Sequence, residues 1–567
     1  MLAIMTFAAY QPVWHAGFIW DDDDHLTANP AMTAPDGLRM IWSSLAVSRY
    51  YPLTLTTFWV QRRLWGLNPM PYHLVNIALH AINGVLVFFV LRRLRVPGAW
   101  FAAMLWTLHP VNVESVAWIT ELKNTQSGLF FLVSVLCFLH VDRQKNHRWY
   151  SLALVCAAAA MLSKPSTVIL PLALLLCAWW ERGRWRNVDW LRIAPVFFLA
   201  LAMSGLAVLE QQRQIHRERT AEWTLAIPER FAIAGKAVWF YAAKVLWPSK
   251  LAFVYPRWAV DAGSLSSWIP LSGLLAVAVV LLAWRRRDWS RAGLFGCGFF
   301  VAALLPVLGF LDVFYFRYSF VADHFQYLAS LGLITLIAAA GVSLCSRVGR
   351  QGARIGVVAA AVLLAISATL TWRQAHIYRN AETLWRDTLA KNPRCWLAHT
   401  NLGVELEKSG RFQEAMSHYR LALLSNPSFA EAHYDLGTVL MRAGTRRDAI
   451  AHLEQAVQLR PDWPPPKNNL AWALATFPRT EGGDPRRATE VAENLGNLSG
   501  NRSPDYLDTM AVAYAAAGRF SEAIATAQKA IDLARAAGQP KLAAEIEARL
   551  QLYRSGRAYH EPLSNKP

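Results

Sequence analysis

Four consecutive carboxylates follow the first apolar stretch of the chain. Residues 18–26 read FIWDDDDHL, in a sequence that has 39 Asp and Glu against 57 Lys and Arg. Adjacent like charges repel one another, and acidic side chains at membrane depth are by default functional. A solvated helix end is an equally common explanation for any single Asp. Four in a row favour function, because a carboxylate can take the proton from an incoming hydroxyl group.

Other polar side chains are predicted to lie on the same side of a membrane as this acidic cluster. They are His109, Glu114, Glu121, Lys123, Asn124, Lys164, Arg317, Asp323, His324 and Tyr327. Each alone is more typical of a loop than of a ligand site, so the argument rests on their convergence. Lys or Arg binds a phosphate and stabilises it as a leaving group. This combination suits a lipid-linked phosphosugar, whose phosphate lies at the bilayer surface.

The composition is that of a membrane protein. The chain has 567 residues, of which 54% are hydrophobic and 17% charged, with 25 Trp and 26 Phe. Its formal charge of +18 comes partly from short Arg runs between apolar stretches, which indicates membrane topology rather than nucleic-acid binding. The six Cys contain no CxxC pair and indicate neither a metal site nor a disulfide framework.

About 11 membrane spans are predicted, which makes the fold all-α. Ten apolar segments are clear, and residues 1–18 form a weaker one without the features of a cleaved signal peptide. We therefore expect the true first helix to begin upstream, from an earlier start codon. The clear segments are 73–91, 97–118, 125–141, 149–163, 166–180, 191–209, 267–284, 292–311, 325–345 and 355–372.

The basic loops fix the orientation, because Lys and Arg are enriched on the cytoplasmic side. LRRLR, DRQKNHR, ERGRWR, WRRRDWSR and SRVGRQGAR are assigned to the cytoplasm. Alternation then places a first loop at 19–72 and everything after residue 373 outside. Residues 232–247 are apolar enough to span, but a span there would reverse WRRRDWSR, so we interpret them as a re-entrant or interfacial helix.

From about residue 380 the chain is polar and repeats itself at a fixed interval. Asn392-Pro393 recurs as Asn426-Pro427, and Leu402-Gly403 recurs as Leu436-Gly437. A period of about 34 residues is the signature of tetratricopeptide (TPR) repeats, whose concave groove binds peptides or proteins. The functional interpretation is recruitment of an acceptor, and the alternative is a spacer or stabilising cap. Residues 475–505 interrupt the period, so an irregular hinge or irregular helix is expected there.

Several motifs, in order, resemble those of the TMTC-type proteins (transmembrane and TPR-containing) and their bacterial relatives. They include FIWDDDDHL, LHPVNVESVAWITELKN, LSKPSTVILPL, ADHFQYLASLG and LWRDTLAKNPRCWLAHTNLG. The resemblance covers nearly the whole chain. It implies a glycosyltransferase of the GT-C fold, and eukaryotic members resemble O-mannosyltransferases that use dolichyl-phosphate mannose, with the TPR part in the lumen.

The resemblance also implies site residues. The family's Asp pair follows an F-x-x pattern in the first outer loop and corresponds to Asp21 and Asp22, the expected catalytic base; Asp23 and Asp24 extend it. The remaining candidates for the donor phosphate or acceptor are His109, Glu114, Lys123, Lys164, Arg317, His324 and Tyr327. Two departures stand out: Ser163-Lys164-Pro165 lacks the Glu of the family's Ser-Lys-Glu, and His324 replaces an Arg.

We therefore expect two domains: a GT-C-like transmembrane glycosyltransferase domain at 1–373 and a soluble TPR α-solenoid at 374–567. The predicted enzyme moves a sugar from a polyprenyl-phosphate lipid donor to a hydroxyl, on Ser or Thr of a protein or peptide bound through the TPR groove. It would lie in the bacterial inner membrane, with the TPR domain in the periplasm and no nucleic-acid partner.

Three questions stay open. The acceptor could be a lipid or cell-surface polysaccharide, or the protein could be a non-catalytic TPR scaffold in the membrane. A divalent cation, Mg²⁺ or Mn²⁺, is a third question, because the carboxylates of Asp22, Asp23 and Asp24 offer the oxygen ligands that such ions prefer.

Overall fold

The structure, a computed structural model, describes residues 1–43, 51–144, 147–218 and 225–561. The parts of the first loop at 44–50, of the DRQKNHR loop at 145–146 and of the predicted outer segment at 219–224 lie outside the described residues, as do residues 562–567. The chain divides into two compact units, Met1–Pro393 and Arg394–Pro567. Each is described by itself below.

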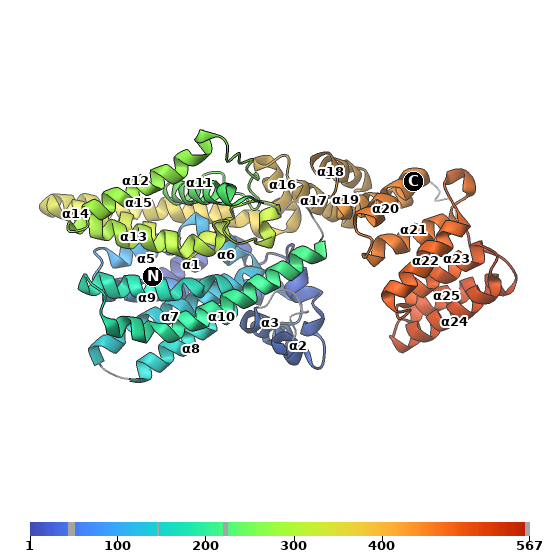
Figure 1. Ribbon diagram of the computed structural model, residues 1–567, viewed down its shortest axis with the longest axis horizontal. Helices are drawn as coiled ribbons and strands as arrows, with labels where there is room; N and C mark the ends of the chain where they lie inside the picture. The colour runs from blue at the N-terminus through green and yellow to red at the C-terminus, as the bar shows by residue number, and fades with distance from the viewer. Residues whose placement is uncertain (44–50, 145–146, 219–224, 562–567) are drawn as a thin grey trace. The chain divides into compact units, whose positions relative to one another are not determined.

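The first unit is a bundle of long helices joined by short ones. Figure 1 shows α7, α8, α9 and α10 running alongside one another, and α7 also packs against α4. The α-helices of this unit are α1 (Leu2–Ala9), α2 (Gly37–Ser43), α3 (Pro52–Trp65), α4 (Pro69–Arg93), α5 (Ala99–Thr107), α6 (Val113–Ala117), α7 (Leu122–Gln144), α8 (His147–Ser163), α9 (Leu170–Arg182), α10 (Asn187–Glu218), α11 (Ile227–Leu246), α12 (Ile269–Ala283), α13 (Asp288–Leu304), α14 (Ser330–Arg347), α15 (Gly349–Ala375) and α16 (Ala381–Lys391).

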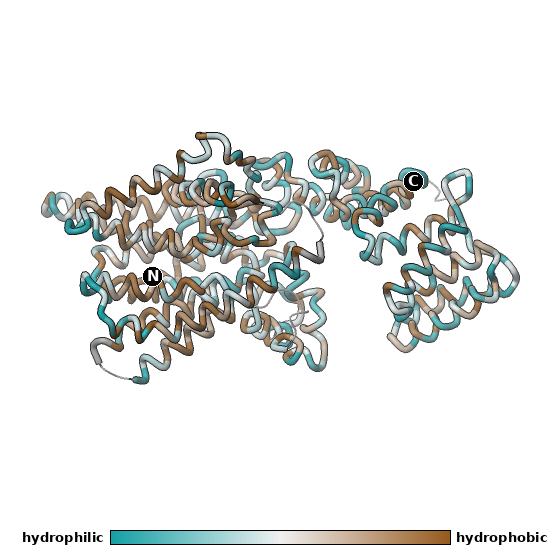
Figure 2. The backbone as a smooth tube through the Cα atoms, viewed as in Figure 1, coloured by the Kyte–Doolittle hydropathy of each residue, from teal (hydrophilic) through white to brown (hydrophobic). Residues whose placement is uncertain are grey.

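Seven helical stretches of the described chain are long and apolar enough to cross a membrane. They are Pro69–Arg93, Ile119–Val141, Asn187–Arg213, Leu265–Ala283, Asp288–Val307, Ser330–Arg347 and Gly349–Arg379. Figure 2 shows hydrophobic residues along these helices and polar ones near many of their ends. Many of their large apolar side chains face outward, as in a helix that contacts lipid; Leu275 and Val279 on α12 are 59% and 64% exposed. The predicted membrane bundle is confirmed.

Seven of the 11 predicted spans coincide with these stretches, and the other four fall on shorter helices, so the total of about 11 stays a prediction. α1 has 8 residues, α8 has 17 and α9 has 13. The fourth, residues 97–118, is not one helix. The predicted re-entrant segment 232–247 belongs to α11, a helix of 20 residues that packs against α12 and α14; its place relative to a membrane stays a prediction.

The break inside residues 97–118 follows from its sequence. α5 ends at Thr107, and Pro110 begins the short helix η4 (Pro110–Asn112). Proline has no N–H to continue a helix and disfavours helical backbone in the residue before it. The chain then makes α6 and η5 (Ile119–Glu121) before α7 begins at Leu122. This run of short helices brings a series of polar side chains into the end of the bundle.

The division after Pro393 lies beyond the predicted boundary at 373, which falls inside α15. The physical reason is α16, the helix that carries the first Asn-Pro of the repeat. Lys391 Nζ donates to the carbonyl of Leu251 at 2.6 Å, and Asn392 Nδ2 donates to that of Val254 at 3.2 Å. The first repeat helix is thus built into the membrane unit.

The second unit is a stack of antiparallel helix pairs, as the repeat period predicts. Its helices are α17 (Trp396–Lys408), α18 (Phe412–Ser425), α19 (Ala430–Arg442), α20 (Arg446–Leu459), α21 (Pro464–Thr476), α22 (Pro485–Ser499), α23 (Pro504–Ala516), α24 (Phe520–Ala536) and α25 (Pro540–Arg554). The expected irregular stretch at 475–505 contains α22, which packs against α21 and α23 and continues the stack.

The recurring glycines explain how closely the paired helices approach. A Cβ atom at Gly403 would lie 2.5 Å from the Tyr419 ring, and one at Gly437 would lie 2.9 Å from Leu453. Both partners are fully buried. A larger residue at either glycine would push the two helices of its repeat apart.

Candidate active site

Asp22 anchors the loop that follows α1 to the short helix that precedes α7. One of its carboxylate oxygens accepts hydrogen bonds from the backbone N–H and the hydroxyl of Thr120, and the other accepts from the backbone N–H of Ile19 at 2.8 Å. The side chain is fully buried. Burial raises the pKa of Asp22 to about 7, while the three donors lower it by favouring the carboxylate. Asp22 therefore holds the loop in place.

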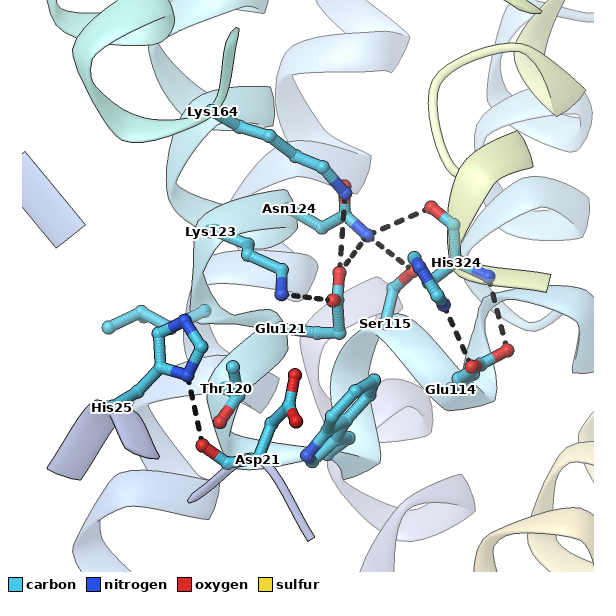
Figure 3. A network of polar contacts seen from close by, with 12 residues as sticks. Asp21, His25, Glu114, Ser115, Thr120, Glu121, Lys123, Asn124, Lys164 and His324 are labelled. Atoms are coloured by element: carbon cyan, nitrogen blue, oxygen red, sulfur yellow. Dashed lines mark hydrogen bonds and ion pairs between the residues drawn. The ribbon is translucent and has the colours of Figure 1, made fainter. Parts of the chain in front are cut away.

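Asp21 lies beside this anchor, close to the buried cations. It is 6% exposed, and its carbonyl accepts a hydrogen bond from His25 Nδ1 at 2.9 Å. In Figure 3 its carboxyl group extends towards the pair formed by Lys123 and Glu121. Asp23 and Asp24 begin the next turn, η2 (Asp23–Thr27), and are exposed. The four acids thus divide into two that face the protein and two that face solvent.

Glu121 is the centre of a buried network of charges (Figure 3). It is fully buried; Oε1 lies 2.8 Å from Lys123 Nζ and Oε2 lies 3.4 Å from Lys164 Nζ. Lys164 also donates to Asn124 Oδ1 at 2.6 Å. Two ammonium groups therefore share the Glu121 carboxylate. Burial lowers the pKa of Lys164 to about 8, against the attraction of Glu121.

A second buried acid pairs with His324 on the other side of the network. His324 Nδ1 lies 2.8 Å from Glu114 Oε1, and its backbone N–H donates to Oε2 at 3.2 Å. Asn124 Nδ2 donates to the His324 carbonyl at 2.9 Å, which joins this pair to the Glu121 network. Burial, together with the charges of Asp323 and Glu121, raises the pKa of Glu114 well above its usual range. The pair can therefore hold a proton at neutral pH.

Aromatic rings form one wall beside Asp21. Trp20 has a positive φ of 43°, which is strained for a bulky residue. Its ring stacks on Trp118, with centroids 5.5 Å apart, and meets Phe253 and Trp385 edge to face. Trp385 lies on α16, so the first repeat helix contributes directly to the wall. These contacts fix the strained backbone that precedes the two inward-facing acids.

The structure places the other predicted residues apart from the Glu121 network. His109 caps η4 and makes a hydrogen bond with the Val245 carbonyl at 3.0 Å. The hydroxyl of Tyr327 bonds with His80 at 2.8 Å and Asn83 at 3.0 Å, inside the bundle. Arg317 lies 5.3 Å from the ring centroid of Phe314 and the same distance from that of Tyr318. Of the candidates, Lys123, Lys164, Glu114 and His324 are the ones that converge.

The acidic cluster does not present three carboxylates to one cation. The oxygens of Asp22 are held by Ile19 and Thr120, and Asp23 accepts from its neighbour Thr27. In the part of the chain that the structure describes, no group of three or more Asp, Glu, His or Cys side chains could hold a metal ion. The arrangement of Asp22, Asp23 and Asp24 gives no support to a shared cation site, which stays a prediction, and no step is derived through one.

Two groups of site residues carried little signal in the sequence. Thr120 is an ordinary polar residue within WITEL, and its role appears only because the short helix η5 turns its N–H and hydroxyl towards Asp22. Trp20 and Trp118 were two among 25 tryptophans. The break at Pro110 was the available clue, since it implies that residues 108–124 form a site rather than the end of a span.

The membrane unit is similar to a known transferase family. Residues 52–208 match the family described as dolichyl-phosphate-mannose-protein mannosyltransferase, and residues 368–431 and 406–473 match tetratricopeptide repeat families. The first of these matches covers Lys123 and Lys164, as well as Glu114 and Glu121. The match at residues 368–431 begins before α16, in agreement with the repeat character of that helix.

Three curated relatives agree with the resemblance to TMTC-type proteins, which is confirmed. The chain is 24% identical over 448 residues to a protein O-mannosyl-transferase of Caenorhabditis elegans, 26% over 490 residues to TMTC4 of Homo sapiens, and 25% over 528 residues to Tmtc1 of Drosophila melanogaster. These alignments cover 74%, 74% and 72% of this chain, but 61%, 64% and 59% of the relatives. The chain thus spans less than two thirds of their length.

Proposed function

We propose that this protein is a membrane glycosyltransferase that moves a sugar from a polyprenyl-phosphate donor to a Ser or Thr hydroxyl of a protein. The observation that carries the proposal is the buried network in which Lys123 and Lys164 surround Glu121 beside the Asp21 carboxyl group. Buried charges are costly and by default functional, and two ammonium groups at one place can hold a phosphate. The names of the matching relatives point to mannose as the sugar.

The reaction needs a base and a stabilised leaving group. Asp21 accepts the proton of the acceptor hydroxyl as its oxygen attacks the anomeric carbon. The bond between that carbon and the phosphate oxygen breaks, and the lipid phosphate leaves with the electron pair. Lys123 and Lys164 stabilise the negative charge that develops on the phosphate. Proton, sugar and phosphate are thus all accounted for without a nucleotide.

Asp21 is a better candidate for the base than Asp22. Both oxygens of Asp22 already accept hydrogen bonds from Ile19 and Thr120, so a substrate hydroxyl would have to displace a backbone contact. The carboxyl group of Asp21 points towards the Lys123–Glu121 pair, where the donor phosphate is proposed to lie. We infer that the pair acts together, with Asp22 fixing the loop and Asp21 taking the proton.

An apolar cavity in the membrane unit supports a lipid-linked donor. It has a volume of about 600 Å³ and is lined by side chains of α4, α7, α9, α13 and α14. On α14 its lining runs from Leu331, close in sequence to His324, to Arg347 at the far end of the helix. We propose that part of the isoprenoid chain lies here and extends along α7 from Phe131, the first lining residue of that helix, towards the phosphate at Lys123. Ala339→Trp, which fills the cavity, should raise the KM for the lipid donor more than it lowers kcat.

We further propose that the repeat unit selects the protein acceptor and lies on the periplasmic side of a bacterial inner membrane. The support is the charge of SRVGRQGAR at the junction of α14 and α15 and the known use of repeat grooves for peptide binding. Cys395 is unsuited to a labelling test because it is buried. Ser409→Cys, at an exposed position, should react in intact spheroplasts with a reagent that cannot cross membranes. Labelling only after lysis would reverse the topology.

The central test compares two aspartates of the same cluster. Purified protein should transfer radiolabelled mannose from polyprenyl-phosphate mannose to a Ser/Thr-rich protein. Asp21→Asn should lower kcat by roughly 10²–10⁴-fold, the usual contribution of a general base. Asp24→Asn is the matched control, because its side chain is exposed, and it should retain nearly full activity. Equal activity of the two variants would reject Asp21 as the base.

A divalent cation stays a prediction, and the same assay tests it. If Mg²⁺ or Mn²⁺ acts at the acidic cluster, chelation should stop transfer and excess metal should partly restore an Asn variant. If Asp21 acts as a base alone, chelation should leave the rate unchanged and excess metal should not rescue Asp21→Asn.

A further inference from the structure

Two histidine pairs occur at equivalent positions of consecutive repeats. His399 on α17 faces His418 on α18, and one repeat later His433 on α19 faces His452 on α20. The two Nδ1 atoms are 2.9 Å apart in both pairs. The ring centroids are 5.2 Å apart in both, with interplanar angles of 31° and 36°. The repetition shows that this is a feature of the repeat rather than an accident of one contact.

In the second pair, His433 carries its hydrogen on Nε2, as does a histidine that binds a metal ion through Nδ1. His433 Nε2 is 3.1 Å from the Pro427 carbonyl and donates its hydrogen there, which leaves a lone pair on Nδ1. A carbonyl that fixes the distant ring nitrogen in this way is the usual support of a histidine ligand. Both rings are half-buried, so an ion can approach from solvent.

The two Nδ1 atoms are close enough to bind one metal ion, and their separation favours one coordination geometry. With metal–nitrogen bonds of 2.0–2.1 Å, two nitrogens 2.9 Å apart subtend an angle of about 90° at the metal. A tetrahedral ion such as Zn²⁺ would need nitrogens about 3.3 Å apart for the same bond length. Square-planar or tetragonal ions with nitrogen ligands are Cu²⁺ and Ni²⁺, and Cu²⁺ binds more strongly in the general affinity order.

We propose that each histidine pair is a two-imidazole site for a tetragonal divalent metal ion, with Cu²⁺ preferred. The ion replaces the hydrogen between the two Nδ1 atoms and links the paired helices of one repeat. His452 then carries its hydrogen on Nε2 instead of Nδ1, so neutral imidazole binds without changing its charge. This proposal concerns the repeat unit and does not depend on the glycosyltransferase activity.

Neighbouring carboxylates distinguish the two sites. Asp448 lies one helical turn before His452, and Glu414 holds the same place before His418. Glu414 already pairs with Arg411 at 2.6 Å. Solvent completes the coordination at both sites. Near the second, Asp448 adds negative charge that outweighs the positive charge of Arg420 on His452. The His433–His452 site should therefore bind Cu²⁺ more tightly than the His399–His418 site.

The test is Cu²⁺ binding by the full-length protein, purified in detergent with a tag that contains no histidine. Titration at pH 7.5 should show that the wild type binds two more Cu²⁺ per chain than the double variant His418→Asn/His452→Asn. The single variant His418→Asn should bind one more Cu²⁺ than the double variant. His560→Asn, at an exposed histidine outside the pairs, is the control and should match the wild type. Equal Cu²⁺ binding by the wild type and the double variant would overturn the proposal.

Electron paramagnetic resonance gives a measurement that needs no variant. The bound Cu²⁺ should give a tetragonal spectrum with coupling to two imidazole nitrogens, and acid should release the ion as the rings protonate. A spectrum without nitrogen coupling would show that the pairs are only hydrogen bonded and would reject the site. This measurement decides the question even if the double variant does not fold.

Discussion

The two units of this protein place their charges in opposite ways. In the membrane unit, Glu121, Lys123 and Lys164 are buried together, with side-chain exposures of 0%, 6% and 11%. In the repeat unit, many ion pairs join neighbouring repeats at the surface. Arg442 is 60% exposed where it meets Glu407 at 2.7 Å, and Arg460 reaches Glu431 in a similar way.

The difference indicates that surface charges contribute to stability, whereas buried charges serve function. Surface pairs contribute about 0–1 kcal/mol each, and the helix packing of one repeat on the next accounts for most of the stability of such an array. Buried charges cost several kcal/mol before any attraction is counted, and their replacement by apolar groups is often stabilising. We therefore expect the three charges and the Glu114–His324 pair of this buried cluster to serve binding or chemistry.

The largest effect should come from where the chain is cut between the units. A chain ending at Pro393 keeps α16 and should retain donor binding and slow donor hydrolysis while losing transfer to protein. A chain ending at Tyr378 also loses Trp385, Lys391 and Asn392, which cover Phe253 and the backbone around it. We expect it to lose both activities, measured by release of labelled sugar.

These two truncations also test the first repeat helix. If the chain ending at Tyr378 hydrolyses donor as well as the one ending at Pro393, α16 is only a linker. Undiminished protein glycosylation by the chain ending at Pro393 would return the repeat unit to the role of a spacer.

The next effect should come from Lys164. Lys164→Met removes the ammonium group and keeps the length of the side chain, and we expect kcat/KM to fall about 10²–10³-fold, as for loss of one charged group that stabilises a transition state. The exposed Lys408, paired with Glu405 at the surface, is the matched control, and Lys408→Met should leave kcat/KM unchanged.

The pH profile provides an independent check on Lys164. Its pKa is lowered to about 8 by burial, so the side chain is a cation below pH 8 and neutral above it. Donor binding should therefore weaken as the pH rises through about 8, and this limb should be absent in Lys164→Met. A profile with the same alkaline limb in both proteins would contradict a role for Lys164 in holding the phosphate.

The two units also differ in how much of their structure could be predicted from the sequence. The repeat unit could be predicted because one regular period carries glycines, prolines and small residues to equivalent places, as at Gly403 and Gly437. The membrane unit is built from contacts that do not recur along the sequence. Hydropathy treats residues 97–118 as a single span, and only the fold shows that the break at Pro110 brings Glu114 and Glu121 into the interior.

The acid cluster shows how much of a site can be predicted from residue type alone. A functional role for it was predicted from four adjacent charges, but the structural difference between Asp21 and Asp22 was not. Asp22 differs from Asp21 because Ile19 and Thr120 point their donors at one carboxylate, and Thr120 lies 98 residues away in the sequence. Contacts of that separation cannot be derived from spacing, so the pair stayed undivided until the fold was known.

A smaller effect, on stability rather than rate, should separate Asp22 from Asp21. Asp22→Asn places an amide NH₂ against N–H groups that need an acceptor, which should cost about 1–3 kcal/mol. The thermal midpoint of the membrane unit in detergent should fall for this variant and stay unchanged for Asp21→Asn. Equal midpoints would mean that Asp22 does not hold the loop.

The smallest effect is expected in the repeat unit, at Asp435. Asn401 and Asn469 hold the equivalent positions of the repeats before and after it, so the acid is the exception. Burial, and then the charges of Glu407 and Glu431, raise the pKa of Asp435 to about 8. Between pH 4 and pH 8 the folded chain holds a proton there that the unfolded chain has lost, so stability falls as the pH rises through that window.

Asp435→Asn removes this dependence and restores the residue found in the neighbouring repeats. The variant should match the wild type near pH 4 and become more stable by about 1–3 kcal/mol at pH 8, less than the full pKa shift would give because the side chain partly reaches solvent. Hydrogen exchange of the α19 amides at pH 5 and pH 8, corrected for the intrinsic rates, measures it. A constant difference at both values would show that Asp435 stays ionised.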